Sequence, residues 1–251
     1  MSGLDADATP ARLRLPHLSP WGWLVAGSVT VLAAAGVLLG ALWFSSMKTT
    51  TVSTHLPGSV LGIELHVQSG DVTIVGGSQS GVAISHSDRS AFGHGARERR
   101  SLRDGIAQIS STCPQLVLGS CASDYRIDVP DNVPLSIRVE NGTVHLAGYH
   151  GSADIATNSG AITVEGYCGF VLGAASASGD VSVQAACSPE RLTLRSDSGD
   201  LSAVVPPGSY RIQAGSTSGS VKVRGVTNDN GAPWAIEALS NSGNVKVANS
   251  S

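Results

Sequence analysis

The chain has 251 residues, a formal net charge of −3 and only 14% charged residues, against roughly 25% in an ordinary soluble globular protein. Its slightly acidic balance excludes a nucleic-acid-binding protein that relies on phosphate contacts, because such a protein carries a strong basic excess. Its hydrophobic content of 41% excludes a wholly disordered chain.

A segment near the N-terminus has the composition of a membrane-spanning helix. Residues 15–47 contain no Asp, Glu, Lys or Arg. At about 1.5 Å per residue, a helix over 21–44 would be long enough for a hydrocarbon core of roughly 30 Å. Aromatic residues, which are typical of membrane interfaces, lie at both of its ends: Trp21, Trp23, Trp43 and Phe44. The sequence therefore predicts a transmembrane helix over 21–46.

The flanking residues predict how this helix is oriented. No small-x-small cleavage site follows the apolar segment, which favours an uncleaved signal-anchor over a signal peptide. Arg12 and Arg14 precede the helix and Lys48 alone follows it closely, so the positive-inside rule places the N-terminus in the cytoplasm. The expected parts are then a cytoplasmic tail over 1–20, a stalk over 47–57 and an extracytoplasmic domain over 58–251 at the plasma membrane.

The predicted helix also contains a packing motif. Gly36 and Gly40 form one GxxxG, a spacing that permits close approach of two membrane helices. The motif favours a homo-oligomer formed through the membrane segment.

A short unit recurs seven times after the helix: a small residue, Gly, any residue, an aliphatic residue, any residue and a second apolar residue. From Asn141 onward, successive copies start 18, 19, 20, 20 and 24 residues apart. Apolar residues alternate on both sides of each glycine, so each unit is predicted to be strand, turn, strand. Each glycine is expected to supply the positive φ of a tight turn. These are Gly70, Gly142, Gly160, Gly179, Gly199, Gly219 and Gly243.

Two all-β architectures fit these repeats. In a β-solenoid, coils of about 18–24 residues stack and the strands of neighbouring coils pair in register. In an antiparallel meander, each Ser-Gly or Asn-Gly is a hairpin turn. The near-constant period favours the solenoid, and the alternation alone leaves the meander open.

Four cysteines offer an independent indication of stacking. Cys168 and Cys187 are one period apart, and stacked coils would place them within disulfide range at about 4.8 Å. Cys113 and Cys121 flank a short local loop. The expected pairs are 113–121 and 168–187, and their presence indicates an oxidising compartment.

Residues 86–123 interrupt the repeats and are expected to form an irregular insert. They carry five of the chain's basic residues: Arg89, Arg97, Arg99, Arg100 and Arg103. One interpretation is a solvated excursion from a coil. The other is a patch for an anionic wall polymer or for lipid headgroups.

Few residues offer catalytic chemistry. Asp180 and Asp200 occupy the same position in adjacent repeats, where stacked carboxylates could act as an acid pair, and Asp197 lies nearby. Against this, Asp after Gly is ordinary turn chemistry. The other copies carry Thr143, Ala161, Ser220 or Asn244 there. The sequence therefore predicts no catalytic residue, no metal site and no cofactor.

The SGDV, SGDL, SGSV and SGNV repeats resemble the bacterial "putative adhesin" family of unknown function, over residues 59–85 and 124–248. Together with the N-terminal helix they are similar to its membrane-anchored actinobacterial type. The resemblance implies a β-solenoid at the cell envelope and no catalytic residues.

The favoured function is a non-enzymatic, single-pass envelope protein whose exposed solenoid binds a protein or a wall polymer. Outward polar residues, one per coil, suit an extended ligand: His145, Thr163, Ser182, Ser202, Lys222 and Lys246. One alternative is a membrane-tethered, self-associating scaffold or a regulatory component of the envelope stress response. A carbohydrate-active enzyme that uses Asp180 and Asp200 is a further alternative.

Overall fold

The computed structural model describes residues 20–46, 48–56, 60–90, 95–114 and 120–250. The chain divides into two units, Met1–Ser45 and Ser46–Ser251. The first unit contains the helix α1, Pro20–Ser46, except for its last residue; the sequence predicts a helix over 21–46. Within the described residues, no helix has the length and apolar character needed to cross a membrane. The tail predicted over 1–20 lies, except for Pro20, outside the described residues.

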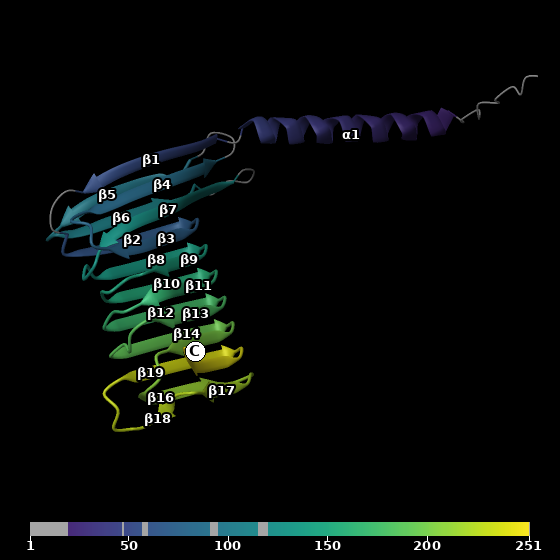
Figure 1. The fold of residues 1–251 in the computed structure, drawn as a ribbon. Helices are drawn as coiled ribbons and strands as arrows, with labels where there is room; N and C mark the ends of the chain where they lie inside the picture. The colour runs from purple at the N-terminus through teal and green to yellow at the C-terminus, as the bar shows by residue number, and fades with distance from the viewer. Residues whose placement is uncertain (1–19, 47, 57–59, 91–94, 115–119, 251) are drawn as a thin grey trace, which may run out of the picture. The chain divides into compact units, whose positions relative to one another are not determined.

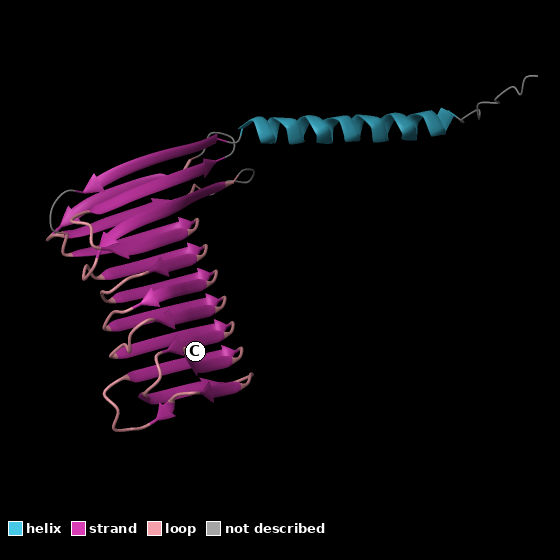
Figure 2. Ribbon diagram, in the orientation of Figure 1, coloured by secondary structure: helices cyan, strands magenta, loops and turns pink. Residues whose placement is uncertain are grey.

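The second unit is built from strands alone in its described residues (Figures 1 and 2). The strands of its first half are β1 Lys48–Leu56, β2 Gly62–Ser69, β3 Val72–Gly77, β4 Val82–Ser90, β5 Arg97–Arg103, β6 Ile106–Thr112, β7 Cys121–Pro130, β8 Leu135–Asn141, β9 Val144–Ala147 and β10 Ala153–Ser159. Those of its second half are β11 Ile162–Tyr167, β12 Val171–Ser178, β13 Val181–Ala185, β14 Arg191–Ser198, β15 Leu201–Val205, β16 Ser209–Ser216, β17 Val221–Arg224, β18 Thr227–Asn228, β19 Ala235–Ser242 and β20 Val245–Asn249.

The strands form two ten-stranded sheets, and each coil gives one strand to each sheet. Sheet A has the order β1-β4-β7-β3-β9-β11-β13-β15-β20-β17, and sheet B has the order β18-β16-β19-β14-β12-β10-β8-β2-β6-β5. Neighbouring coils pair in parallel and in register, as in Ile155↔Ala174 and Ile162↔Val181. This confirms the solenoid and excludes the antiparallel meander for the stacked coils.

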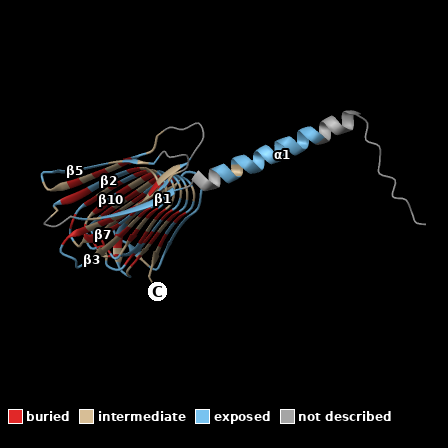
Figure 3. Ribbon diagram, turned by 90° about the horizontal axis from the view of Figure 1, so that it is seen from above, coloured by how far each residue is buried: buried red, intermediate tan, exposed pale blue. Residues whose placement is uncertain are grey.

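The core lies between the two sheets because one side of each strand is apolar. One inward row on sheet A consists of Val144, Ile162, Val181, Leu201 and Val245, each at most 1% exposed. Buried and exposed residues alternate along the strands (Figure 3). Full burial of one such side chain is worth about 1.5–3 kcal/mol, so the ladders supply the main stabilisation of the stack.

The coils do not stack in the order of the sequence. The C-terminal coil, β19 and β20, lies between the β14–β15 coil and the β16–β17 coil. In Figure 1 the yellow β19 is therefore found between β14 and β16. The chain first places β18 against the outer edge of β16 and then returns through residues 229–234 to pair β19 with β14. The longer spacing before the last repeat is therefore explained by residues that carry the chain from the outer edge of β16 back to β14, and not by a simple loop.

Both expected disulfides are present. Cys113–Cys121 has a Cα–Cα distance of 5.7 Å. Cys168–Cys187 joins adjacent coils with a Cα–Cα distance of 4.7 Å, as the strand spacing predicts.

The prediction of a stalk over 47–57 is wrong for its described residues. Strand β1 pairs antiparallel with β4 from Lys48↔Ser90 to Leu56↔Val82 and forms the edge of sheet A. Its sequence, KTTTVSTHL, resembles a polar linker, but its β-branched Thr and Val residues also favour a strand.

The prediction that 86–123 is irregular is also wrong for most of its described residues. This segment contains the end of β4, all of the antiparallel pair β5–β6 and the start of β7. Asp104 and Gly105, with φ of 52° and 77°, form the two-residue turn of that hairpin. An Asp-Gly pair between two strands strongly favours a hairpin turn. The charged residues near it obscured the alternation of apolar and polar residues by which the two strands could have been recognised in the sequence.

Candidate functional site

The repeat glycines form a column along one end of the coils. A Cβ added to Gly142, Gly160, Gly179, Gly199 or Gly243 would overlap the carbonyl oxygen of the column glycine in the neighbouring coil. Of the seven, only Gly70, Gly142, Gly160 and Gly179 have φ in the left-handed region. Close backbone approach, rather than the predicted positive φ alone, therefore requires glycine throughout the column.

Small hydroxyl residues three positions before these glycines support the column. Thr157, Ser176 and Ser196 are buried, and each donates its hydroxyl to the carbonyl of Gly142, Gly160 or Gly179, at 3.3, 3.0 and 3.1 Å. Sequence reasoning missed this role. The sequence does show that a Ser or Thr recurs three positions before several of the repeat glycines, and this recurrence could have indicated the role.

The predicted pairing of Asp180 with Asp200 is present, but its chemistry is structural. Asp180 Oδ1 accepts the backbone N–H of Asp200 at 2.8 Å, and Asp200 Oδ1 accepts that of Asn244 at 2.6 Å. Asp197 lies apart from them and accepts a bond from the Asn241 amide at 3.0 Å. The carboxylates of Asp180 and Asp200 each cap the turn of the next coil, which is the ordinary role of Asp beside a turn glycine.

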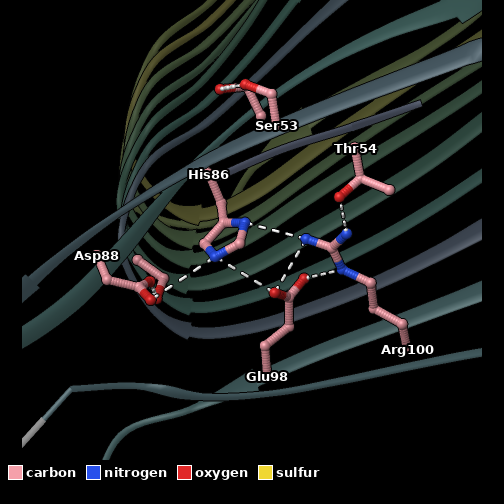
Figure 4. Close-up of polar contacts among 8 residues, drawn as sticks. Ser53, Thr54, His86, Asp88, Glu98 and Arg100 are labelled. Atoms are coloured by element: carbon pink, nitrogen blue, oxygen red, sulfur yellow. Dashed lines mark hydrogen bonds and ion pairs between the residues drawn. The ribbon is translucent and has the colours of Figure 1, made fainter. Parts of the chain in front are cut away.

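A polar cluster joins the two sheets at the β1–β5 end of the stack (Figure 4). His86 and Asp88 come from β4 of sheet A, while Glu98 and Arg100 come from β5 of sheet B. His86 Nε2 lies 3.3 Å from Glu98 Oε2 and 3.7 Å from Asp88 Oδ2. Arg100 bonds Glu98 at 2.5 Å and donates to Thr54 of β1 at 2.5 Å.

The hydrogen bonds of this cluster define the tautomer of His86. Arg100 Nη2 lies 3.0 Å from His86 Nδ1, and a guanidinium can only donate. Nδ1 must therefore accept, which leaves the ring proton on Nε2, facing the two carboxylates. Tyr125 stacks on the ring at 5.5 Å, and its burial, with a further contribution from Glu98, raises the pKa of its hydroxyl. The cluster thus cross-links the sheets where the aliphatic ladders end.

Arg100→Met should destabilise the solenoid by about 1–3 kcal/mol, because it leaves the half-buried carboxylate of Glu98 without its cation. Arg126→Met is the matched control, since Arg126 is 59% exposed and lies 3.6 Å from Asp128 on the outer face. The control should cost about 0.5 kcal/mol or less. Urea unfolding of the purified protein, followed by circular dichroism, measures both. Equal effects of the two substitutions would contradict a structural role for the cluster.

The outer face of sheet B carries three adjoining hollows, which together we call the sheet B trough. The first, of about 700 Å³, lies over β5, β6, β2 and β8 and includes His66 and Arg138 in its lining. The second, of about 370 Å³, shares His66 and Arg138 with it and extends to Asn158. The third, of about 330 Å³, shares Asn158 with the second and ends at Arg195 and Asp197 of β14.

Small side chains explain why this face is hollowed. Ala156 and Ala175 lie side by side on β10 and β12, with Arg138 of β8 beside one and Arg195 of β14 beside the other. The two alanines form the floor and the two arginines rise on either side of it. Sequence reasoning missed the trough, because an outward Ala in a strand carries no polar or charged group that would indicate a binding surface.

The polar row that the sequence predicts lies on the other sheet. His145, Thr163, Ser182 and Ser202 are cross-strand neighbours on sheet A. Because of the displaced coil, Lys246 follows Ser202 and Lys222 comes last. The predicted ladder therefore exists, but the trough is on sheet B.

Gly36 and Gly40 lie in α1 with nothing within 4 Å of an added Cβ, and their role in helix packing stays a prediction. Among the described residues, no group of three or more His, Cys, Asp or Glu side chains is arranged to hold a metal ion.

Comparison with known proteins identifies the fold family. A search of curated proteins found no match. A crystal structure of a "putative cell adhesion protein" from Clostridium sporogenes ATCC 15579 aligns with a TM-score of 0.50 at 12% identity, covering 81% of this chain and 100% of that one. A "putative adhesin" from Bacteroides fragilis NCTC 9343 aligns with a TM-score of 0.37 at 14% identity, covering 80% and 97%.

At such low identity the first of these structures supports the fold alone. The profile of one domain family, described as Toastrack DUF4097, matches residues 34–251. This match covers the whole coil stack, and the chain therefore belongs to the Toastrack DUF4097 family.

Proposed function

We propose that the protein is a non-enzymatic binding module of the cell envelope that holds a partner protein or a wall polymer in the sheet B trough. The observation that carries this proposal is the run of three adjoining hollows along one sheet. An extended ligand suits such a surface, because the trough crosses successive coils rather than closing around a small molecule. The description of one structure of similar fold as a "putative cell adhesion protein" agrees with this role.

The same proposal includes membrane anchoring through α1, with the solenoid on the outer side of the plasma membrane. Its support is the absence of charged residues from 15–47 and the two arginines that precede this segment. The two disulfides support an oxidising compartment for the solenoid. Cysteine labelling at an introduced Ser2→Cys and at an introduced Ser250→Cys, in intact cells and after permeabilisation, tests the orientation. Labelling of Ser2→Cys in intact cells would contradict it.

Filling the trough should abolish binding to the envelope. Ala175→Trp places an indole on the floor of the trough and should lower the fraction of protein retained by isolated cell envelopes at least tenfold. Thr163→Trp is the matched control, because Thr163 is also a half-exposed outward residue, on sheet A of the same stack. Retention is measured by co-sedimentation of the purified protein with the envelopes. Undiminished retention of Ala175→Trp would remove the trough from the proposal.

A further inference from the structure

We propose that the sheet B trough selects a linear polyanion, whose phosphate or carboxylate groups bind a row of basic residues across the strands. This rests on the proposed binding function and adds the chemical class of the ligand. The row consists of Arg99, His66, Arg138 and Arg195; His66 and Arg138 are adjacent, and small residues of intervening strands separate the other members.

The register of sheet B places these residues in one line. Arg99 and His66 both pair with Ser110 of β6, and His66 pairs in turn with Arg138. From Arg138 the line continues through Ala156 and Ala175 to Arg195. The row spans seven strands, so at about 4.8 Å between strands it extends about 29 Å along the trough.

The charges of the row are available to a ligand. Within the described residues, the side chain of Arg99 makes no hydrogen bond or ion pair, and the same holds for Arg103, which lines the first hollow. Arg138 and Arg195 pair with Asp154 and Glu237 at 2.5 and 2.7 Å, with the four side chains between 32% and 62% exposed. Exposed pairs of this kind contribute about 0–1 kcal/mol, so an anionic ligand can exchange with the carboxylate.

Five carboxylates reduce the positive field: Glu64, Glu140 and Asp197 line the hollows, and Asp154 and Glu237 pair with two of the arginines. Glu140 lies 3.4 Å from His66, and Glu64 accepts a bond from Gln108 at 2.9 Å. The row therefore offers discrete cationic positions rather than a uniformly basic surface. A polymer with regularly spaced anionic groups can meet these positions in turn, while a single small anion meets only one.

The concave shape favours a polymer over a membrane surface. Arg138 and Arg195 stand at the two sides of the alanine floor, so an extended chain laid across the strands can contact both guanidinium groups and the floor between them, which a planar headgroup layer does not follow. Guanidinium groups bind phosphate and carboxylate oxygens through paired hydrogen bonds, so they suit either kind of polyanion.

Edge protection offers a different account of Arg99. Strand β5 is the edge of sheet B, and charged residues on an edge strand oppose pairing with another chain. This account does not apply to Arg138 and Arg195, because β8 and β14 lie inside the sheet. Substitutions at these two interior positions therefore separate ligand binding from edge protection.

The test uses the full-length protein in nanodiscs of neutral phosphatidylcholine, with linear polyphosphate and linear polyglutamate as probes. Wild-type protein should bind at least one of the two polymers, with affinity that falls as salt rises and increases with polymer length up to about 29 Å. Arg138→Gln combined with Arg195→Gln should lower this affinity at least tenfold. Arg126→Gln combined with Lys222→Gln removes the same charge from sheet A and should lower it less than twofold.

Several outcomes would overturn the proposal. These are failure of wild-type protein to bind either polymer, equal losses in the two double variants, or binding to phosphatidylglycerol vesicles in place of the polymers. Envelope retention distinguishes this failure from that of the proposed function. If Ala175→Trp abolishes retention while Arg138→Gln with Arg195→Gln leaves it intact, the trough binds a ligand that is not a polyanion. If neither affects retention, both proposals fail.

Discussion

Gly160→Ala should lower the free energy of unfolding by about 3–5 kcal/mol, one of the largest effects expected from a single methyl group in this protein. Gly160 has φ of 144°, and its added Cβ would overlap the carbonyl oxygen of Gly142 in the neighbouring coil. That oxygen also accepts the hydroxyl of Thr157. The added Cβ is fixed to the backbone of one coil, and the oxygen that it overlaps belongs to the backbone of the next. Neither atom can rotate away, so the overlap can be relieved only if the two coils separate.

Gly166→Ala is the matched control for this prediction. Gly166 also has positive φ, 63°, but its added Cβ would meet only Gly148 atoms at 3.7 Å, an ordinary contact. The control should therefore cost only the backbone strain, about 1–2 kcal/mol. Gly199→Ala, which lacks left-handed φ but has the overlap, should resemble Gly160→Ala. Urea unfolding distinguishes the three, and equal losses at Gly160 and Gly166 would show that φ alone matters.

Truncation after Pro233 should disrupt two coils rather than one. It removes β19 and β20, which pair with β14 and β15 on one side and with β16 and β17 on the other. Without them, β17 has no partner strand in sheet A and β16 keeps only the short β18. Backbone amides of residues 209–224 should then exchange with solvent at least a hundredfold faster, as measured by hydrogen–deuterium exchange.

An internal deletion supplies the control for the truncation. Replacing residues 206–234 by a five-residue linker, the length between β13 and β14, would connect β15 directly to β19. This deletion removes more residues than the truncation, but it takes out the β16–β17 coil as a whole and keeps β19 and β20 paired with β14 and β15. It should therefore cost less stability. A larger loss in the internal deletion would contradict the coil order described above.

The sequence predicts the repeat unit well and the order of the coils poorly. Strand, turn and core positions follow from glycine and aliphatic periodicity, and the spacing of Cys168 and Cys187 independently indicates stacking. The order of the coils along the stack depends on the edge strands against which each coil packs. Val221-Lys222-Val223 and Val245-Lys246-Val247 have the same pattern of residues, so the periodicity cannot distinguish a middle coil from an end coil. The inward faces nevertheless differ, since Val221 is 42% exposed and Val245 is 1% exposed.

The polar surfaces were harder to predict for a different reason. Alternation separates inward from outward residues, but it does not show which outward residues share a row on one sheet. Arg99, His66, Arg138 and Arg195 come from four separate stretches of the chain, and only the register brings them into line. The cluster around His86 similarly required β4 and β5 to face one another, within a segment that the sequence suggested was irregular.

The displaced C-terminal coil also affects the time course of folding. A solenoid can grow by adding each coil to the previous one as the polypeptide emerges. Here β16 and β17 are synthesised before the strands against which they pack, so they must wait until β19 and β20 have been made. The edge of β15, whose core residues are Leu201, Ala203 and Val205, remains uncovered during the same interval. Folding of this end is therefore delayed until β19 and β20 are available, and during that interval the exposed strand edges are open to pairing with another chain.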